Sequence, residues 1–457
     1  MSKIVLIKTA PEKILQGQWY HMPLLNLGYL AAVLEQKGVD VRVIDAQFES
    51  LGLAKTVERA RKAGAKMFAI TAMTHEIHRA HEVAEAIKEV VPGAVVIVGG
   101  PHPTALPVRT MEEFPSFDYL IVGEGELTLA KLVEGLENKA DISTIHGLVY
   151  RKDGKVVENE PRTWIKDLDT IPFPAWHLYP RSDEYPVFTS RGCPYRCYFC
   201  MRILGSHVRF RSVENVMEEL AYVYENFKPS KITFYDETFT VNEKRTRELM
   251  EAIIKSGLHR KIKWYIQTRV DLVDYSLFRK MKEAGCHGIG FGIESGSDSI
   301  LKEVGKKITT EQAREAVRQA KKAGVETSGY FIIGHPNETK EDILNTIDFA
   351  AKLNTTQVAI GIMVPYPGTD IYNMAINGQC GYKVISSDWT DFNKHLGNAL
   401  ELQQLDRRSL ELLQMRAYLV FYLRNLRFLS LIGYIFEKRA AIFFMVKKVF
   451  FRKGRAG

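Results

Sequence analysis

The sequence predicts an α/β protein with two consecutive parallel sheets and a helical C-terminal region. Short apolar runs alternate with segments of helical periodicity, first within residues 3–122 and again within residues 187–363. The Pro-rich stretch 159–184 separates the two series. Strands that alternate with helices are typical of parallel sheets with helical connections. We therefore expect a Rossmann-like N-terminal sheet, a partial (β/α)6 barrel and a helical end.

The first series predicts a doubly wound sheet. It starts with the expected strand 3–8, whose residues 4–7 are all apolar, as in sheets that are buried on both faces. Asp153-Gly154 predicts the turn of a hairpin at 145–158, which closes a first domain of residues 1–158, and 159–184 is the expected linker. The other expected strands are 39–45, 67–72, 94–98 and 118–122, with helices at 24–37, 53–63 and 76–90.

The second series predicts a barrel domain of residues 185–382, followed by a mostly helical region of residues 383–457. Functional residues of such barrels lie at the C-terminal ends of the strands. The expected strands are 187–191, 231–236, 263–268, 287–293, 327–333 and 357–363. The expected helices are 213–227, 243–256, 274–284, 310–323 and 340–352.

Composition indicates a protein of a reducing compartment. Of five cysteines, three fall within eight residues, which suits a metal or cluster site better than a disulfide framework. The N-terminus lacks the layout of a secretory signal, and no apolar run reaches the roughly 18–20 residues that span a bilayer. We therefore expect a cytoplasmic location.

The strongest motif is Thr189-Ser-Arg-Gly-Cys193-Pro-Tyr-Arg-Cys197-Tyr-Phe-Cys200. Three thiolates can hold three irons of a cubane cluster and leave the fourth iron open to an exogenous chelate. The arginines before and between the cysteines, Arg191 and Arg196, would offset negative cluster charge. The alternatives are a zinc site, for which His207 is the one nearby fourth ligand, and inert buried thiols.

This Cys-x3-Cys-x2-Cys spacing, with Phe199 directly before the third cysteine, resembles the radical S-adenosylmethionine (SAM) superfamily. The resemblance implies a [4Fe–4S] cluster on Cys193, Cys197 and Cys200. It further implies SAM bound at the open iron and cleaved to methionine and a 5′-deoxyadenosyl radical that abstracts a substrate hydrogen. An external one-electron reductant of the flavodoxin or ferredoxin type is then required.

Further segments at the ends of expected barrel strands resemble the SAM-binding elements of that superfamily. The acidic pair would contact the SAM amino group, the arginine its carboxylate, the Glu-Ser pair its ribose or carboxylate, and the glycine its adenine. Taken alone, the acidic pair also fits a helix N-cap, and the arginine a surface ion pair. The residues are Asp236, Glu237, Arg269, Glu294, Ser295 and Gly334.

The N-terminal sheet resembles the cobalamin-binding domain of one radical SAM subclass. Glycines and threonines at its strand ends would let a cofactor approach the crevice at the switch point. The Asp-x-His-x-x-Gly motif of methionine-synthase-like domains is absent, so cobalt would lack that lower ligand. The expected cobalamin contacts are Thr71, Thr74, Gly99, Gly100, Gly123 and Glu124.

These resemblances imply a cobalamin-dependent radical SAM methyltransferase that acts on an unactivated carbon. One alternative is a radical cyclase or oxidative rearrangement of the anaerobic magnesium-protoporphyrin ester cyclase type. A second alternative is a corrinoid or SAM sensor without turnover. The sequence assigns no further catalytic residue, substrate or oligomeric state.

The C-terminal region is the basic part of the chain. Residues 401–457 hold twelve Lys/Arg and four Asp/Glu, which accounts for the whole net charge of +8, and ten Phe/Tyr fall within 405–453. Such a segment fits a helical cap over the barrel mouth, a peripheral contact with a membrane or lipid substrate, or nucleic acid. No nucleic-acid recognition module is visible. The expected substrate is therefore a small or lipid-like molecule.

Overall fold

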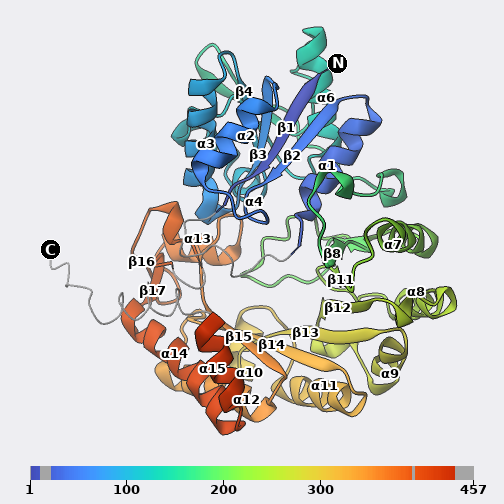
Figure 1. Cartoon of the computed structure of the whole chain (residues 1–457). Helices are drawn as coiled ribbons and strands as arrows, with labels where there is room; N and C mark the ends of the chain where they lie inside the picture. The colour runs from blue at the N-terminus through green and yellow to red at the C-terminus, as the bar shows by residue number, and fades with distance from the viewer. Residues whose placement is uncertain (1, 11–21, 394–396, 438–457) are drawn as a thin grey trace. The chain divides into compact units, whose positions relative to one another are not determined.

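The computed structural model describes residues 2–10, 22–393 and 397–437, which divide into two compact units (Figure 1). The first comprises residues 1–193 and 202–229, and the second comprises residues 194–201 and 230–457. The domain limits given above stay a prediction. Each unit is described by itself.

The first unit contains a seven-stranded sheet in the order β2-β1-β3-β4-β5-β6-β7. Strands β1 to β5 are parallel, and the hairpin β6–β7 is antiparallel, so the predicted sheet and its closing hairpin are confirmed. Asp153 and Gly154 form the hairpin turn with φ of +50° and +75°. The strands are β1 (Lys3–Lys8), β2 (Asp40–Asp45), β3 (Met67–Thr71), β4 (Val95–Gly99), β5 (Tyr119–Ile121), β6 (Leu148–Lys152) and β7 (Lys155–Glu158).

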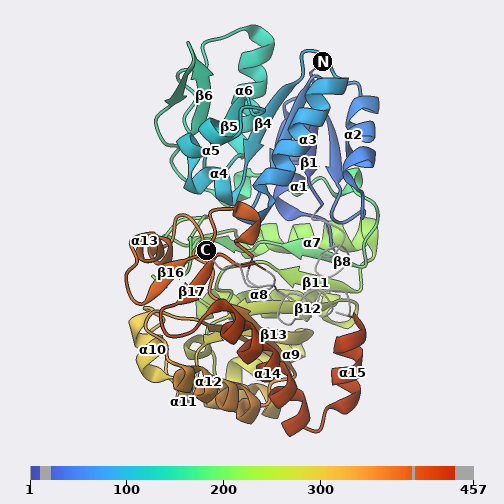
Figure 2. The ribbon, with the colours of Figure 1, turned by 90° about the vertical axis from the view of Figure 1, so that its left-hand side faces the viewer.

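Helices cover both faces of this sheet. Helix α1 (Leu25–Gln36) packs against α6 (Glu126–Asn138), and α2 (Leu53–Lys62) packs against α3 (Ile77–Val90), which lies in front of the strands in Figure 2. The strand order reverses between β1 and β3, the place where doubly wound sheets bind ligands.

Three helices of this sheet were not predicted. One is α6, and the other two are the short helices α4 (Pro101–Ala105) and α5 (Pro107–Glu113). Both short helices begin at a proline, which is compatible with the first helical position because that residue needs no N–H donor.

The expected linker is packed against α1. The Ala175 N–H donates to the Gly28 carbonyl at 3.0 Å, and the Tyr179 hydroxyl donates to the Leu24 carbonyl at 2.9 Å. A Cβ on Gly28 would lie 2.8 Å from the Cβ of Pro174, so glycine permits this close approach. Trp176 is fully buried there. The segment therefore belongs to the core of the first unit.

The expected strand 187–191 is wrong in its bounds. It is divided into β8 (Glu184–Val187) and β9 (Ser190–Arg191), and β9 pairs antiparallel with β10 (Arg209–Phe210). Ser212 then caps α7 (Val213–Phe227) with its side chain. The cysteine motif thus forms part of the loop between two antiparallel strands, which local patterning did not indicate because each strand has only two residues.

The second unit contains the predicted barrel strands as a parallel series. Strands β11 to β15 follow one another in sequence order within the sheet, with a helix between each pair (Figure 1). The strands are β11 (Lys231–Phe234), β12 (Lys263–Thr268), β13 (Cys286–Glu294), β14 (Glu326–Ile333) and β15 (Gln357–Ile362). The helices are α8 (Glu243–Ser256), α9 (Tyr275–Glu283), α10 (Asp298–Glu303), α11 (Thr310–Lys322) and α12 (Lys340–Leu353).

The C-terminal region continues this unit with α13 (Asp370–Ile376), the β16–β17 hairpin (Tyr382–Val384, Leu400–Leu402), α14 (Arg407–Arg424) and α15 (Phe428–Glu437). Helix α14 lies along the last strand. Gln414 Nε2 donates to the Ile360 carbonyl at 2.7 Å, and the Tyr418 hydroxyl accepts from the Ile360 N–H at 3.0 Å. These bonds satisfy backbone groups on the open side of β15.

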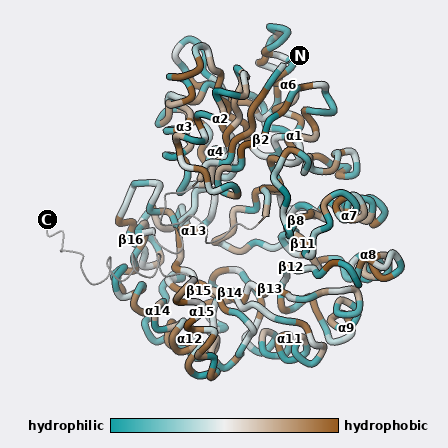
Figure 3. Tube along the Cα trace, in the orientation of Figure 1, coloured by the Kyte–Doolittle hydropathy of each residue, from teal (hydrophilic) through white to brown (hydrophobic). Residues whose placement is uncertain are grey.

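The described part of the C-terminal region is mostly helical, as expected, apart from the β16–β17 hairpin. Residues 438–457 lie outside the described residues. The tube of α15 is largely apolar in Figure 3. None of the helices that the structure describes combines the length and the apolar character needed to cross a membrane.

Candidate functional site

The first end of the cysteine loop is fixed by backbone contacts within the first unit. Gly192 has a φ of +100°, and a Cβ there would collide with the His207 carbonyl oxygen. The Cys193 N–H donates to the Gly205 carbonyl at 3.1 Å. The residue before Cys193 therefore has to be glycine, both for its dihedral angle and for space.

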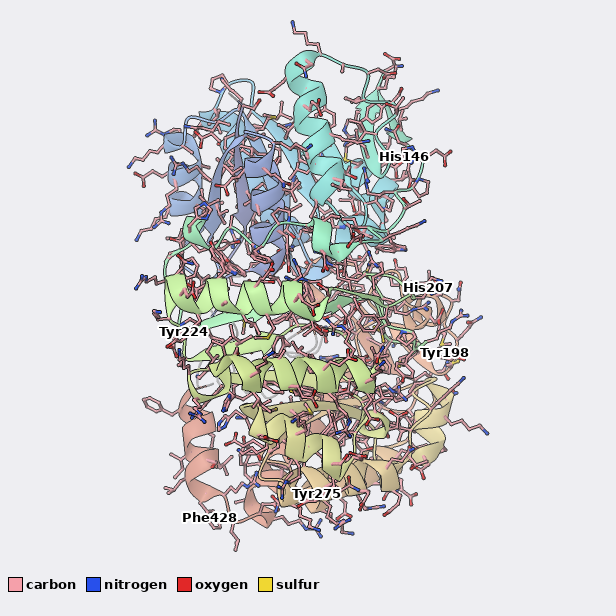
Figure 4. All side chains as sticks on the ribbon, turned by 90° about the vertical axis from the view of Figure 1, so that its right-hand side faces the viewer. His146, Tyr198, His207, Tyr224, Tyr275 and Phe428 are labelled. Atoms are coloured by element: carbon pink, nitrogen blue, oxygen red, sulfur yellow. The ribbon has the colours of Figure 1, made fainter. Side chains whose placement is uncertain are left out.

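The middle of the loop packs within the second unit on the segment that follows α10. The Tyr198 N–H donates to the Val304 carbonyl at 3.0 Å, and the Tyr198 carbonyl accepts from the Ile371 N–H at 3.1 Å. A Cβ on Gly305 would lie 2.6 Å from the Arg196 carbonyl oxygen. The chain around Cys197 is thus held on two sides, and Figure 4 labels Tyr198 there.

Of the three motif cysteines, Cys193 and Cys197 are partly buried and Cys200 is exposed. Burial raises the pKa of Cys197 to about 11, although the nearby cations of Lys306 and Arg269 act to lower it. A cluster ligand must be a thiolate, so iron binding has to release this proton. No group of three or more His, Cys, Asp or Glu side chains within the described ranges converges on a single metal ion. In a cubane each iron takes one thiolate, so three cluster ligands need not meet at one point.

The predicted SAM contacts lie at the C-terminal ends of four consecutive strands of the second unit. Asp236 and Glu237 follow β11, Arg269 follows β12, Glu294 ends β13 with Ser295 directly after it, and Gly334 follows β14. The ends of β11 and β12 are tied together, since the Phe239 N–H donates to the Gln267 carbonyl at 3.1 Å. The fold therefore brings these segments to one edge of the sheet. Their contacts with SAM stay a prediction.

Arg269 is the predicted SAM contact that the surrounding residues orient most clearly for binding an anion. Its Nε and Nη2 bind both carboxylate oxygens of Asp271 at 2.9 Å, and its guanidinium carbon lies 3.8 Å from the centre of the Tyr195 ring. Its Nη1 is buried and has no hydrogen-bond partner within the described structure. Arg269 is therefore a buried, oriented cation whose Nη1 still offers its N–H donors to an anionic ligand such as a carboxylate.

Glu294 is held in an unusual conformation by a residue that sequence reasoning missed. It has a φ of +72°, and its Oε1 accepts from Lys306 Nζ at 2.9 Å, with both side chains largely buried. A Cβ on Gly292 would lie 2.6 Å from that oxygen. No motif pointed to Lys306, because only the fold brings the turn after α10 back to the end of β13.

Two other predicted contacts are engaged with the protein itself. Ser295 is fully buried, lies 3.2 Å from the Thr346 hydroxyl and accepts from the Ser297 N–H at 3.2 Å. The Gly334 N–H donates to Glu338 Oε2 at 2.5 Å, and its carbonyl accepts from the Tyr382 hydroxyl at 3.2 Å. Ser295 and Gly334 thus form hydrogen bonds that hold the ends of β13 and β14 in place.

Glu338 and His335, which follow Gly334, were not singled out from the sequence. The His335 N–H donates to Glu338 Oε2 at 3.0 Å. Burial raises the pKa of Glu338 to about 8 and lowers the pKa of His335 to about 4. Both groups therefore favour their uncharged forms near neutral pH.

The predicted cobalamin contacts also gather at one edge, the C-terminal ends of β3, β4 and β5 in the first unit. Gly100 has a φ of +106°, and a Cβ there would lie 2.8 Å from the Ala72 carbonyl oxygen and 2.9 Å from Thr71 Oγ1. Thr71 Oγ1 accepts from Asn26 at 3.3 Å, and the Gly123 N–H donates to Thr104 at 3.1 Å. Thr74 is buried directly after β3, and Gly99 ends β4.

Glu124 differs from these neighbours, because its carboxylate lies inside a buried group of charges. It binds Arg191 Nη1 at 3.0 Å and Arg209 Nη1 at 2.9 Å, and Arg191 also binds Glu126 at 2.8 Å. Two carboxylates thus compensate the charge of Arg191 within the first unit. Its expected effect on the charge of a cluster stays a prediction. Arg196 is exposed and lies 3.9 Å from Asp370.

The chemistry of the donors fits the implied groups. Three cysteine side chains stand in one loop, and the Nη1 of Arg269, which has no hydrogen-bond partner within the described structure, suits the carboxylate of a bound amino acid. In the first unit, Gly99 and Gly100 at the end of β4 and Gly123 after β5 lie at the same C-terminal edge of the sheet as the switch point between β1 and β3. Doubly wound sheets bind ligands at that edge.

Comparison with protein families gives two matches, one for each of the two expected α/β domains. The radical SAM superfamily matches residues 187–350, and the B12 binding domain matches residues 20–133. The first match includes all three motif cysteines and the expected SAM contacts. The second includes every expected cobalamin contact.

Individual relatives cover most of the chain. An uncharacterized methyltransferase of Pyrococcus horikoshii is 37% identical over 88% of this chain and 88% of its own length. The anaerobic magnesium-protoporphyrin IX monomethyl ester cyclase of Cereibacter sphaeroides is 30% identical over 78% of this chain but only 60% of its own length. The solved structure of the cobalamin-dependent SAM radical enzyme OxsB, with aqua-cobalamin and SAM bound, gives a TM-score of 0.76 at 18% identity over 97% of this chain and 72% of that one. The fold expected from the sequence is confirmed.

Proposed function

This chain belongs to the radical SAM superfamily, in the class with an N-terminal B12-binding domain, and on that premise we propose that it is a cobalamin-dependent methyltransferase. The proposed reaction is methylation of an unactivated carbon of a small or lipid-like molecule. When bound, the cluster and SAM supply a hydrogen-abstracting radical, and the corrinoid supplies the methyl group.

The observation that carries the proposal lies within the second unit, where Arg269 at the end of β12 and the segment after α10 both contact the cysteine loop. The Arg269 guanidinium stacks on Tyr195, and the Val304 carbonyl accepts from the Tyr198 N–H. The residues of the proposed SAM site are thus in direct contact with the loop of the proposed cluster site. SAM has to reach both the open iron and these strand ends, so such proximity is required.

In this scheme, the residues of the chain bind the cluster and SAM and orient SAM. Cys193, Cys197 and Cys200 would hold three irons as thiolates. Arg269 would offer the N–H donors of its Nη1 to the SAM carboxylate. Glu294, fixed by Lys306, would accept from a ribose hydroxyl or the amino group, because an ionised carboxylate has several acceptor sites.

Methyl transfer is favoured over cyclisation by the extent of the similarity. The archaeal relative named as a methyltransferase is matched over 88% of its length, whereas the cyclase is matched over 60%. A substantial part of the cyclase therefore has no counterpart in this alignment. A sensor without turnover is disfavoured by the intact cysteine motif.

The experiment is anaerobic reconstitution of the full chain followed by reduction with SAM and hydroxocobalamin. We expect about four irons per chain, an electron resonance signal that changes with SAM, and release of 5′-deoxyadenosine. Failure to release 5′-deoxyadenosine would favour the sensor. A corrinoid that does not bind under saturating anaerobic conditions would refute methylation. With candidate substrates, a mass gain of one CH2 group supports methylation, and a loss of hydrogens supports the cyclase type.

For the tail we propose a peripheral contact with anionic lipid, in a cytoplasmic enzyme. Leu429, Ile432 and Phe436 on α15 are 85%, 62% and 70% exposed, and Figure 4 labels Phe428 at the start of this helix. Seven Lys/Arg and no acidic residue follow in 438–457. Apolar side chains beside basic residues favour an anionic membrane surface.

The membrane proposal predicts flotation of the full chain with phosphatidylglycerol vesicles but not with phosphatidylcholine vesicles. Leu429→Asp should abolish flotation, and Leu412→Asp, at an exposed site on α14, should leave it unchanged. Equal flotation of both variants, or none for the native chain, would contradict the proposal.

A further inference from the structure

Six oppositely charged side chains are buried together in the first unit, in equal numbers of arginines and glutamates. Arg191 pairs with Glu124 and Glu126, and Arg209 also pairs with Glu124. A neighbouring pair, Arg211 and Glu219, is almost completely inaccessible. Buried charges of this kind persist only where they are mutually compensated, so their arrangement is strongly constrained.

Two of these arginines lie at facing positions of the ribbon that carries the cysteine loop. In the β9–β10 pair, Arg191 is the direct partner of Arg209, and the chain between them includes all three motif cysteines. Gly192 and Cys193 follow Arg191 immediately. Any movement of the Arg191 backbone is therefore passed to the first cluster ligand.

Glu124 joins both strands of that ribbon to the parallel sheet. Its Oε1 accepts from Arg191, and both of its oxygens lie 2.9 Å from Arg209 Nη1. Its Oε2 also accepts from the Ile165 N–H at 2.8 Å. The side chain is 1% exposed. The acceptor sites of the carboxylate are thus occupied by the protein, which leaves little capacity for a corrinoid amide.

The ring of Tyr29 completes this environment from α1. The Arg191 guanidinium lies 5.0 Å from its centre, and the Tyr29 ring stacks with Phe188 at 6.5 Å. Arg191 is therefore held by two carboxylates and a ring face, and its backbone is paired with β10. Few alternative positions remain for the start of the loop.

We propose that Glu124 is a positioning residue for the cluster. It fixes both strands of the β9–β10 ribbon on the B12-binding sheet, and through Arg191 it sets the position of Cys193. This goes beyond the proposed function, because it assigns to the strand-end motif Gly123-Glu124-Gly-Glu126 a part in holding the cluster rather than a carboxylate contact with cobalamin.

The test compares Glu124→Gln with Glu76→Gln in the full chain. Glu76 is an equally buried carboxylate of the same unit, and it pairs with Lys8 instead of the ribbon. The first measurement is amide hydrogen exchange of residues 189–193 and 205–211 in the protein without cluster. We expect exchange about tenfold faster in Glu124→Gln and unchanged in Glu76→Gln, because only the first change leaves ribbon arginines uncompensated.

The second measurement is the rate at which the reconstituted cluster loses iron to a chelator. We expect about tenfold faster loss for Glu124→Gln, partial recovery with Glu124→Asp, and corrinoid affinity within about twofold of native. Unchanged ribbon exchange would overturn the proposal, as would a large loss of corrinoid affinity with normal iron retention. Amide hydrogen exchange of the ribbon is measured without a cluster. It therefore tests the positioning role of Glu124 even if the native protein takes up no iron and the proposed function fails. Should Glu124→Gln not fold, Arg209→Lys tests the same contact.

Discussion

The guanidinium carbon of Arg269 lies 3.8 Å from the centre of the Tyr195 ring. Tyr195 stands between Cys193 and Cys197 in the chain, and Arg269 follows β12. The contact therefore joins the cysteine loop to the strand ends of the second unit. It also orients the buried Nη1 that has no partner in the described structure.

Arg269→Lys is expected to weaken SAM binding by tenfold or more. Lysine cannot bind Asp271 through two parallel bonds and still offer an oriented donor, and a charge-assisted hydrogen bond contributes about 1.5–3 kcal/mol. The measurement is a SAM titration of the reduced cluster followed by electron resonance. Arg247→Lys, at an outer arginine of α8 that pairs with Glu243, serves as the control. Equal affinities would remove Arg269 from the SAM site.

Cys197→Ala is expected to abolish SAM cleavage and most iron uptake while the first unit stays folded. The thiol is one of the three proposed cluster ligands, and Cys197 belongs to the second unit rather than to the first. Iron content, 5′-deoxyadenosine release and circular dichroism are the measurements. Cys380→Ala removes a partly buried thiol outside the motif and should retain native iron. Normal cleavage by the Cys197 variant would contradict the cluster assignment.

Gly192→Ala is expected to disrupt the loop far more than Gly257→Ala. Both glycines have positive φ, +100° and +77°, so both substitutions carry a similar backbone penalty of about 1 kcal/mol. Only at Gly192 would the new Cβ also collide with the His207 carbonyl, whereas nothing lies within 4 Å at Gly257. Iron retention after reconstitution and thermal unfolding distinguish the two variants. Native iron retention in Gly192→Ala would show that the loop can adapt.

Glu338→Gln is expected to change the pH dependence of stability. Burial raises the pKa of Glu338 from 4.5 to about 8, so the folded chain keeps a proton that the unfolded chain releases between these values. Its contribution to the free energy of unfolding is fully present below about pH 4.5 and is lost as the pH rises through about 8. Glutamine cannot titrate and keeps an oxygen that accepts from Gly334 and His335.

The measurement for this prediction is denaturant unfolding at pH 5 to 9 of native chain, Glu338→Gln and Glu341→Gln, an exposed carboxyl on α12. The difference between Glu338→Gln and native should shift in favour of the variant as the pH rises. A constant difference across the range would mean that Glu338 is ionised in the folded protein throughout.

Most of the architecture could be predicted because it depends on local patterns. Strands 3–8 and 263–268 and helices 213–227 and 243–256 agree residue for residue with the structure, since apolar runs, caps and glycines define them within a few positions. The cluster motif and the position of the candidate residues after strands were also predicted from local sequence patterns. The strands β9 and β10 were not predicted, because a strand of two residues is too short to show an alternating apolar pattern.

The sequence by itself determined most of the order of strands and helices, the thiol triplet and the strand ends that carry the candidate site residues; helices α4, α5 and α6 and the short strands β9 and β10 were not among the expected elements. Only the tertiary structure decided the partners of the charged groups. Glu124 meets Arg191 across 67 residues, and Lys306 returns to Glu294 around α10. The physical reason is that a strand end is defined by its neighbours in the chain, whereas an ion pair is defined by which distant segments share one desolvated volume.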